Sequence, residues 1–243
     1  MAAAWRLLDT WDGEPGFHMA LDEALLLAGP ERPTLRFYTW RPAALSLGYF
    51  QRVRDVPAIA EAPACVRRLT GGGAIHHADE LTFAITAPQD HPLYRGEVRA
   101  SYERVHAALA EAFRELGVQA DLRRSQELSS DLEASGMCFH VSTPLDLAWD
   151  ARKGVGSAQR RTGGRVLHHG SIKLGASALE PGVATLRSHA PEVTPGRLAE
   201  RIAACFERRF ECHLERDEIT PEEHERAQER AGFFTSEAFV RRR

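Results

Sequence analysis

The sequence predicts a mixed α/β fold, because segments with the periodicity of helices and segments with the pattern of strands are interspersed along its 243 residues. Apolar residues recur at helical spacing over residues 101–117, which predicts an amphipathic helix. Residues 34–47 alternate in polarity and are rich in aromatic side chains, as strands are. The composition, 43% hydrophobic and 27% charged, is ordinary for a globular protein, and the length fits one large domain or two small ones.

The first predicted helix covers residues 16–28, where apolar side chains recur turn by turn until Gly29 ends the helix. The face that we expect to be buried carries Met19, Ala20, Glu23, Ala24 and Leu27. Asp22 and Glu23 are adjacent, and neighbours on a helix point about 100° apart. We therefore interpret the two acids as a capping or solvent-exposed pair and not as an acid/base pair.

Short strands and turns are predicted next. Residues 34–47 form two strands that Arg41-Pro42 separates. Residues 55–64 are rich in alanine and predict a short helix. A strand over residues 64–69 then leads into a glycine-rich loop, and residues 81–86 are expected to return beside it.

The middle of the chain combines the clearest helix with a polar loop. In the helix over residues 101–117, Ser101 is expected to cap the start and Gly117 to end it. Its apolar stripe is interpreted as core. Residues 123–136 contain several serines and charged side chains, so we expect an exposed and mobile loop that leads to Cys138.

The last third of the chain predicts strands followed by helices. Residues 146–148 and 154–160 are expected to pair, with residues 165–174 as a third strand. The remainder is predicted to be helical. Thr194 and Thr220 each precede a proline and open a helix, the second with Glu223 in a capping box.

Charge and cysteine content exclude several classes of protein. The formal net charge of −3 gives no reason to expect nucleic-acid binding. The four cysteines have no metal-ligand spacing, and free thiols in a reducing compartment fit best. Residues 1–9 lack the order of a secretion signal, and no apolar run approaches the ~20 residues that span a bilayer. We expect a cytoplasmic protein without a membrane anchor.

Two polar motifs far apart in the chain predict one shared site. Residues 66–77 place three glycines after two arginines and a threonine, and residues 153–162 with 166–172 form a second polar block. Glycines allow backbone N–H groups to approach an anion or a polar acyl carrier. The alternative for the first motif is a tight hairpin that only turns the chain. Neither a Walker loop nor a dinucleotide fingerprint is present.

The histidines do not predict a metal site. His76-His77 and His168-His169 are adjacent pairs, and His140 stands alone. Neighbours on a strand point to opposite faces, so each pair offers at most one ligand to a face. We expect no metal.

Cys138 is the candidate nucleophile because it follows a polar loop and does not lie within an apolar stripe. A reactive thiolate needs access and a nearby positive charge, and Lys153 is the candidate charge. The alternative is an inert buried thiol, which is the interpretation that we give to Cys65.

Several spaced motifs in this order resemble the lipoate and octanoate branch of the biotin and lipoate protein ligase superfamily. The resemblance covers residues from about 5 to 175. It is carried by Arg67-Arg68-x-Thr70-Gly71-Gly72-Gly73-Ala74-Ile75-x-His77, by Lys153-x-x-Gly156-Ser157-Ala158-Gln159 and by His169-Gly170-Ser171, with segments 5–10, 19–25 and 33–50 before them. It implies a single catalytic domain over residues 1–243, with mixed and antiparallel sheets packed by helices and an apolar tunnel for an acyl chain.

Cys138-Phe139, 15 residues before Lys153, resembles the cysteine-bearing octanoyltransferases of that branch. The resemblance implies that Cys138 is the nucleophile and that Lys153 stabilises its thiolate. It also implies that the other motif residues bind substrate: Arg68, Thr70, Gly71, Gly72, Gly73, Ala74, Ile75, His77, Gly156, Ser157, Ala158, His169 and Gly170. His77 and His169 are candidates for a general base.

The implied reaction moves octanoate from octanoyl-acyl carrier protein to a lysine of a lipoyl domain, such as the glycine cleavage H protein or a 2-oxoacid dehydrogenase E2, without a cofactor. An ATP-dependent lipoate ligase is an alternative, which the full triple glycine favours. The chain has no room for the C-terminal accessory domain of many ligases, which favours the transferase. An amidotransferase between lipoyl proteins and a non-catalytic acyl-binding protein are further alternatives.

Overall fold

A computed structural model describes residues 3–243; residues 1–2, with which the predicted domain and the N-terminal segment begin, lie outside the described residues. Two sheets are present. The larger contains β1 (Ala3–Gly13), β2 (Thr34–Trp40), β6 (Glu80–Pro88), β7 (Asp121–Leu122), β8 (Leu147–Trp149), β9 (Arg152–Thr162), β10 (Arg165–Lys173) and β11 (Cys212–Arg216). The smaller contains β3 (Ala44–Leu47), β4 (Cys65–Arg67) and β5 (Ile75–His77).

The strand order of the larger sheet is β11-β1-β2-β6-β10-β9-β8-β7, and that of the smaller sheet is β4-β3-β5. β1 pairs in parallel with both β2 and β11, whereas β6, β9 and β10 pair antiparallel with their neighbours. The sheets are therefore mixed, and the predicted fold class is confirmed.

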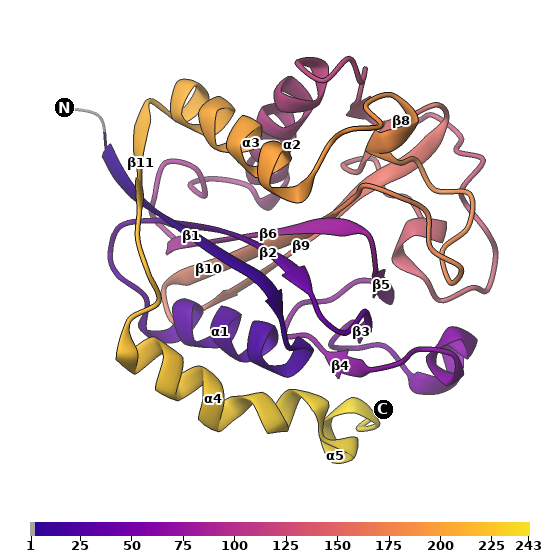
Figure 1. Cartoon of the computed structure of the whole chain (residues 1–243), viewed down its shortest axis with the longest axis horizontal. Coiled ribbons are helices and arrows are strands. Elements are labelled where there is room, and N and C mark those ends of the chain that lie inside the picture. The colour runs from indigo at the N-terminus through magenta and orange to yellow at the C-terminus, as the bar shows by residue number, and fades with distance from the viewer. Residues whose placement is uncertain (1–2) are drawn as a thin grey trace.

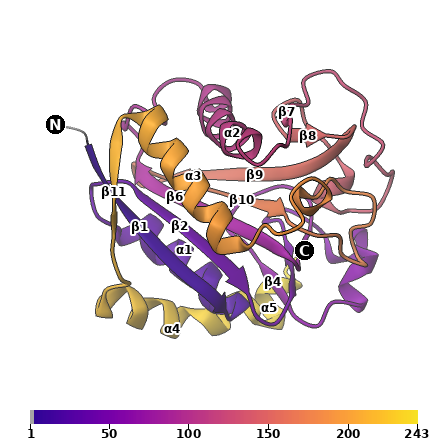
Figure 2. The same ribbon diagram turned by 45° about the horizontal axis from the view of Figure 1, so that its top comes forward.

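Helices cover both faces of the larger sheet (Figures 1 and 2). α2 (Val98–Arg114) and α3 (Pro195–Phe210) lie on one face, and α1 (Pro15–Ala28) and α4 (Pro221–Thr235) lie on the other, where α5 (Glu237–Val240) follows. Trp5, Phe113 and Phe206 belong to the core on the first face, and Leu21 and Phe234 to the core on the second. Four short 3₁₀ turns complete the structure: η1 (Val53–Asp55), η2 (Pro57–Ala60), η3 (Cys138–His140) and η4 (Leu186–Ser188).

α1 confirms the first predicted helix, but its orientation differs from the expected one. Asp22, interpreted as a capping or solvated residue, is 1% exposed, whereas Leu27 on the expected buried face is 62% exposed. The reason is that the sheet covers one side of the helix and α4 covers another. Because two sides of the helix are buried, its sequence has no single apolar stripe from which the orientation could be predicted.

Three local predictions are wrong: one concerns strand pairing, one a short helix, and one the start of α2. Residues 81–86 belong to β6, which pairs with β2 and β10 and not with β4. Residues 55–64 contain only the short turn η2 in place of an α-helix. Ser101 lies inside α2, where its Oγ donates to the Val98 carbonyl, and the helix starts after Glu97.

Other predictions are confirmed. β8, β9 and β10 pair as expected, although β8 and β9 reach further into the turn than predicted. Thr194 caps α3, and Thr220 with Glu223 forms the capping box of α4. Segment 123–136 has neither helix nor strand. The sequence analysis missed β1, β5, β7 and β11.

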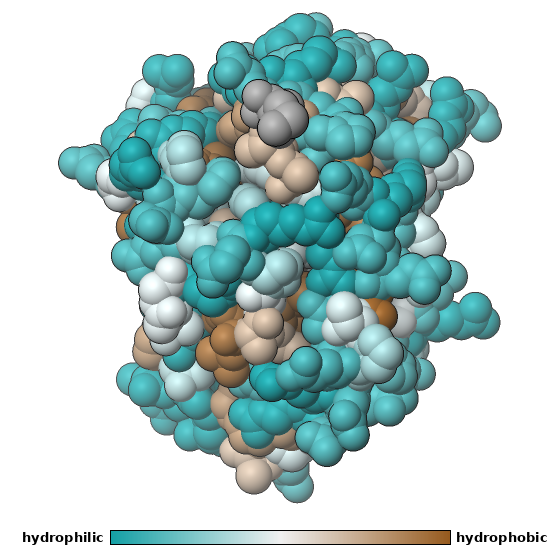
Figure 3. Space-filling view, turned by 90° about the vertical axis from the view of Figure 1, so that its left-hand side faces the viewer, coloured by the Kyte–Doolittle hydropathy of each residue, from teal (hydrophilic) through white to brown (hydrophobic). Residues whose placement is uncertain are grey.

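β11 forms one edge of the larger sheet, on the left in Figure 1. Its outward residues are charged or polar (His213, Glu215 and Arg216), and this face of the molecule is mostly hydrophilic (Figure 3). Charged edge strands discourage further strand pairing. Across residues 3–243, none of the helices combines the length and the hydropathy needed to cross a membrane.

Candidate active site

Cys138 is held by backbone hydrogen bonds beside the glycine loop. Its N–H donates to the Ala74 carbonyl at 2.7 Å, and the Ala74 N–H donates to the Gly136 carbonyl at 2.9 Å. A Cβ at Gly73 would lie 2.8 Å from the Cys138 nitrogen. Real Cβ atoms do not approach a neighbour so closely, so glycine is required for this contact.

Lys153 lies directly behind Cys138. Its Nζ is 3.5 Å from Cys138 Sγ, and it donates to the carbonyls of Cys138 at 2.8 Å and Val141 at 3.2 Å. It also forms an ion pair with Asp146 Oδ2 at 2.8 Å. The lysine is 1% exposed, so this set of contacts excludes water from its ammonium group.

Lys153 remains protonated although its side chain is buried. Burial acts to lower its pKa, but the nearby Cys138 sulfur and the Asp146 carboxylate outweigh burial and raise the pKa above its ordinary value. The side chain is therefore an ammonium at neutral pH. A fixed, dry cation therefore lies 3.5 Å from the sulfur of the candidate nucleophile.

Gly156 leaves room for the side chains of Cys138 and Lys153 because it has no side chain of its own. The pairing of β8 with β9 is irregular between Leu147 and Ala148, and Gly156 follows on β9. A Cβ at Gly156 would lie 3.0 Å from Lys153 Cε and 3.3 Å from Cys138 Sγ. Any side chain here would press on the cysteine and the lysine.

A cavity with about 410 Å³ of space, part of it open to solvent, has Cys138 in its wall. Most of its wall is apolar. It brings together the predicted site residues Arg68, Gly71, Gly72, Ile75, His77, Cys138, Gly156, Ser157, Ala158, His169 and Gly170. Four predicted site residues do not line the cavity, but each contacts a residue that does: Thr70, Gly73, Ala74 and Lys153.

Arg68 holds the glycine loop in place by donating hydrogen bonds to backbone carbonyls. Its Nη2 donates to the Gly71 carbonyl at 2.9 Å and to the Gly73 carbonyl at 2.6 Å, and its Nη1 donates to the Ser46 carbonyl at 2.9 Å. The guanidinium is 3% exposed. It therefore fixes the shape of the glycine loop from inside.

His169 connects the cavity to a buried charge network. Its Nδ1 is 3.0 Å from Asp22 Oδ2, and its Nε2 is 2.7 Å from Thr70 Oγ1. Burial acts to raise the pKa of Asp22, but the hydrogen bond from His169 and the charge of Arg36 outweigh burial and lower the pKa. An ionised carboxylate only accepts, so His169 donates from Nδ1.

His77, also in the cavity wall, belongs to a second network. Its Nδ1 is 2.6 Å from Glu80 Oε1, its Nε2 is 2.7 Å from Ser46 Oγ, and its ring stacks on Trp40. Burial lowers the pKa of His77 to about 4, against the effect of Glu80. Lys173 completes the network, with Nζ 2.8 Å from Glu80 Oε2. His77 is therefore neutral at neutral pH.

The sequence analysis missed part of the wall, namely Met19, Tyr38, Trp40, Ser46, Thr82 and Ser171. It also missed the roles of Asp22, Asp146 and Glu80. The aromatic residues of β2 were visible in the sequence, but only as a strand pattern. Local sequence carries no signal that α1 and β2 face the same cavity as β9.

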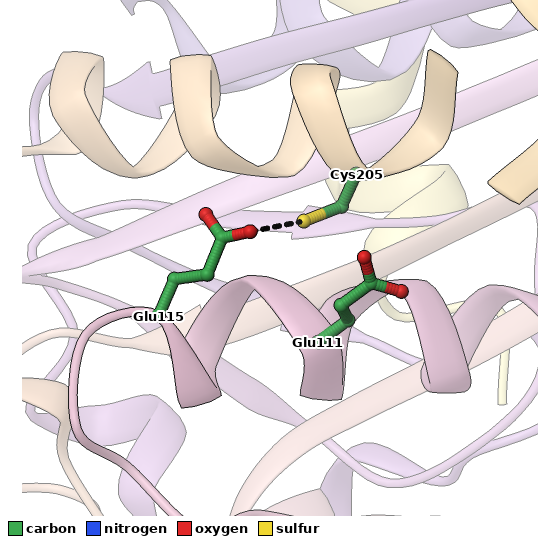
Figure 4. Close-up of side chains that lie close together, drawn as sticks. All are labelled: Glu111, Glu115 and Cys205. Atoms are coloured by element: carbon green, nitrogen blue, oxygen red, sulfur yellow. Dashed lines mark hydrogen bonds between the residues drawn. The ribbon is translucent and has the colours of Figure 1, made fainter. Parts of the chain in front are cut away.

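One group among residues 3–243 has the residue types of a metal site: Glu111 on α2, Glu115 directly after the end of α2, and Cys205 on α3 (Figure 4). Arg208 Nη2 already binds this group, at 3.0 Å from Glu111 Oε1 and 2.5 Å from Glu115 Oε1. Burial raises the pKa of Cys205 to about 11, which disfavours a metal-binding thiolate. The group is an ion-pair cluster between two helices.

The chain is similar in sequence to known proteins. A family model described as "Lipoyl protein ligase A/B catalytic domain" matches residues 14–207. Octanoyltransferase LipM of Moorella thermoacetica is 45% identical over 180 residues, 71% of this chain and 66% of that protein, which is just under two thirds of its length. Octanoyltransferase LipM of Kyrpidia tusciae is 34% identical, over 93% of this chain and 94% of that protein.

The fold is also shared with a solved structure. The bipartite lipoate protein ligase of Thermoplasma acidophilum, described with its E2 lipoyl domain, has a TM-score of 0.78 and 19% identity. The similarity covers 98% of this chain and 96% of that one. At this identity the likeness supports the fold alone.

Proposed function

The chain belongs to the family of lipoyl protein ligase A/B catalytic domains, and from this premise we propose that it is an octanoyltransferase that works through a thioester on Cys138. The observation that carries the proposal is the contact of Cys138 Sγ, in the wall of a largely apolar cavity, with the buried ammonium of Lys153 3.5 Å away. A thiol can store an acyl group, so the reaction needs no nucleotide. The name octanoyltransferase among the similar proteins agrees with this chemistry.

The donor in this proposal is octanoyl-acyl carrier protein. The Cys138 thiolate attacks the carbonyl carbon of the donor thioester, a new carbon–sulfur bond forms, and the carrier leaves as its thiol after it takes up a proton. The apolar wall, which includes Met19 and Ile75, holds the octanoyl chain. Lys153 stabilises the attacking thiolate and the negative charge that develops on the carbonyl oxygen.

Backbone N–H groups of the glycine loop are the second candidates to hold that oxygen. Gly71 and Gly72 line the cavity, and within residues 3–243 their N–H groups donate to no backbone carbonyl. Such N–H groups, beside the Arg68 guanidinium, form a suitable site for an oxyanion. This assignment keeps the predicted ligand role of the loop.

The acceptor in this proposal is the lysine amine of a lipoyl domain. The neutral amine attacks the carbonyl carbon of the Cys138 thioester, an amide forms, and the cysteine leaves as a thiolate. The amine nitrogen loses a proton in this step. His169 lines the cavity, pairs with the Asp22 carboxylate and is the candidate to receive it, whereas burial lowers the pKa of His77 to about 4. Both histidines are hydrogen-bonded on both ring nitrogens.

The test is acyl transfer without nucleotide. Incubated with octanoyl-acyl carrier protein and no acceptor, the protein is expected to gain one octanoyl group on Cys138, seen by intact-mass measurement. Cys138→Ser is expected to fold but to carry no adduct. Cys65→Ser, Cys205→Ser and Cys212→Ser are matched controls, because burial raises the pKa of each of these thiols to about 11.

Two outcomes would contradict the proposal. An octanoyl adduct that survives Cys138→Ser would place the nucleophile elsewhere. Transfer that strictly requires ATP and releases AMP would assign the protein to the lipoate ligases instead. A reaction that uses an octanoylated lipoyl protein as the donor would keep the chemistry and change only the source of the acyl group.

A further inference from the structure

A cluster of exposed arginines lies where the C-terminal residues meet the segment between β3 and η1. Arg52, Arg54, Arg241 and Arg243 line one surface hollow, and each is exposed. The whole chain has a formal net charge of −3. The positive charge of this surface is thus a local feature. We call these four residues the arginine surface.

The arginine surface is attached to the rim of the active site. Gln51 Nε2 donates to the Gly136 carbonyl at 2.6 Å, two residues before Cys138. A Cβ at Gly71 would lie 3.9 Å from the Phe50 ring. The segment that carries Arg52 therefore touches both the glycine loop and the segment that presents the nucleophile.

Arg67 holds the two halves of the surface together. Its Nη1 donates to the carbonyls of Gly48 at 2.6 Å and Gln51 at 2.8 Å, and its Nε donates to the carbonyls of Phe239 and Val240, each at 3.0 Å. The side chain is fully buried. One rigid clamp thus fixes the C-terminal arginines next to Arg52.

The charges of this surface are only partly paired by nearby acids. Arg54 is 3.9 Å from Asp55, and Arg241 is 3.2 Å from Glu237, and both pairs are exposed to solvent. Such pairs contribute little. Arg52 and Arg243 form no ion pair within residues 3–243. Arg243 lies over the ring of Phe50, which is 64% exposed, so an apolar group and a cation share the rim.

We propose that the arginine surface docks the acyl carrier protein that delivers the octanoyl thioester, through negative charge on the carrier. This inference rests on the proposed function. Exposed arginine beside an exposed aromatic ring is typical of a protein interface. The positive charge of the surface is complementary to the donor, because the donor thioester hangs on an arm that contains a phosphate.

The test compares two donors with one variant. Acylation of Cys138 is measured with octanoyl-acyl carrier protein and with octanoyl-pantetheine, which lacks both the phosphate and the carrier. Arg52→Ala/Arg54→Ala is expected to lower kcat/KM for the carrier by about tenfold at low salt, less at high salt, and to leave octanoyl-pantetheine unchanged. Arg114→Ala/Arg197→Ala, on α2 and α3 across the sheet, is the matched control and is expected to change neither rate.

Binding without chemistry keeps the two proposals apart. The affinity of an octanoyl-amide of the carrier protein, which cannot transfer its acyl group, is expected to weaken by about the same factor in Arg52→Ala/Arg54→Ala. Unchanged affinity, equal loss with both donors, or a loss confined to transfer onto the lipoyl domain would overturn the docking proposal. A carrier that binds in this way but never acylates Cys138 would support docking and contradict the proposed function.

Discussion

Gly156→Ala tests whether the close contact between Cys138 and Lys153 sets the rate of acylation. The added methyl carbon would lie 3.0 Å from Lys153 Cε, 3.3 Å from Lys153 Nζ and 3.3 Å from Cys138 Sγ. Unstrained carbon atoms lie about 3.5–4.0 Å apart. The lysine, the cysteine or both must therefore move by about 0.5 Å or more. No ionisable group is added or removed, so the change is one of geometry alone.

Both the rate and the stability are expected to respond. A displacement of about 1 Å from reactive geometry can lower a rate by about a hundredfold, so a loss of roughly ten- to a hundredfold in the acylation rate is expected. Insertion of a methyl group into a packed site lowers the free energy of unfolding by about 1–3 kcal/mol. The second effect leaves the protein folded at room temperature, where the assay is made.

The assay is the single-turnover formation of the octanoyl adduct, followed by intact mass, with thermal unfolding measured on the same samples. Gly196→Ala is the matched control, because a Cβ at Gly196 in α3 has no heavy atom within 4 Å. It is expected to keep the wild-type rate. If Gly156→Ala acylates within twofold of wild type, the contact of Lys153 with Cys138 does not control the reaction.

Two further predictions concern the buried charges. Lys153→Ala should lower the acylation rate by at least about a hundredfold and destabilise the fold, because it leaves the Asp146 carboxylate buried without a cation. Lys153→Ala/Asp146→Asn should recover stability but not activity, measured by urea unfolding and adduct formation; recovery of activity would refute a role for the ammonium. The free energy of unfolding should fall as the pH falls from 6.5 toward 4, since His77 has a pKa of about 4 when folded and the unfolded state binds the extra proton. His77 contributes on the order of 3 kcal/mol to this change, and His77→Gln should show a shallower pH dependence than wild type.

The elements that the sequence predicted are those whose signal is local. The capping box of α4 and the three strands β8, β9 and β10 involve residues close in the chain. The parallel pairing of β1 with β11 joins Ala3 to Cys212, and nothing in either segment identifies the other. β5 is only three residues long and pairs with β3 across the glycine loop, too short for a periodicity to show.

The same limit applies to the site. The motif residues on the glycine loop and on β9 and β10 were predicted, and most of them line one cavity. Asp22 was assigned to the helix surface because the sequence shows only the order of residues on α1. Its partners Arg36 and His169 come from β2 and β10. Only because α1 packs across these strands do the two partners offset the free-energy cost of burying the Asp22 carboxylate. A residue whose partners all come from other elements leaves no local pattern.

The third glycine of the loop now has a physical explanation that bears on the choice between transferase and ligase. The resemblance had associated Gly73 with the ATP-dependent enzymes, yet a Cβ there would lie 2.8 Å from the Cys138 nitrogen and 3.0 Å from its Cα. The Cys138 N–H bonds to the neighbouring Ala74 carbonyl, so the loop and the nucleophile are in direct contact. Because the backbone of Cys138 itself requires a glycine at this position, the triple glycine gives no support to a nucleotide-dependent reaction in this chain.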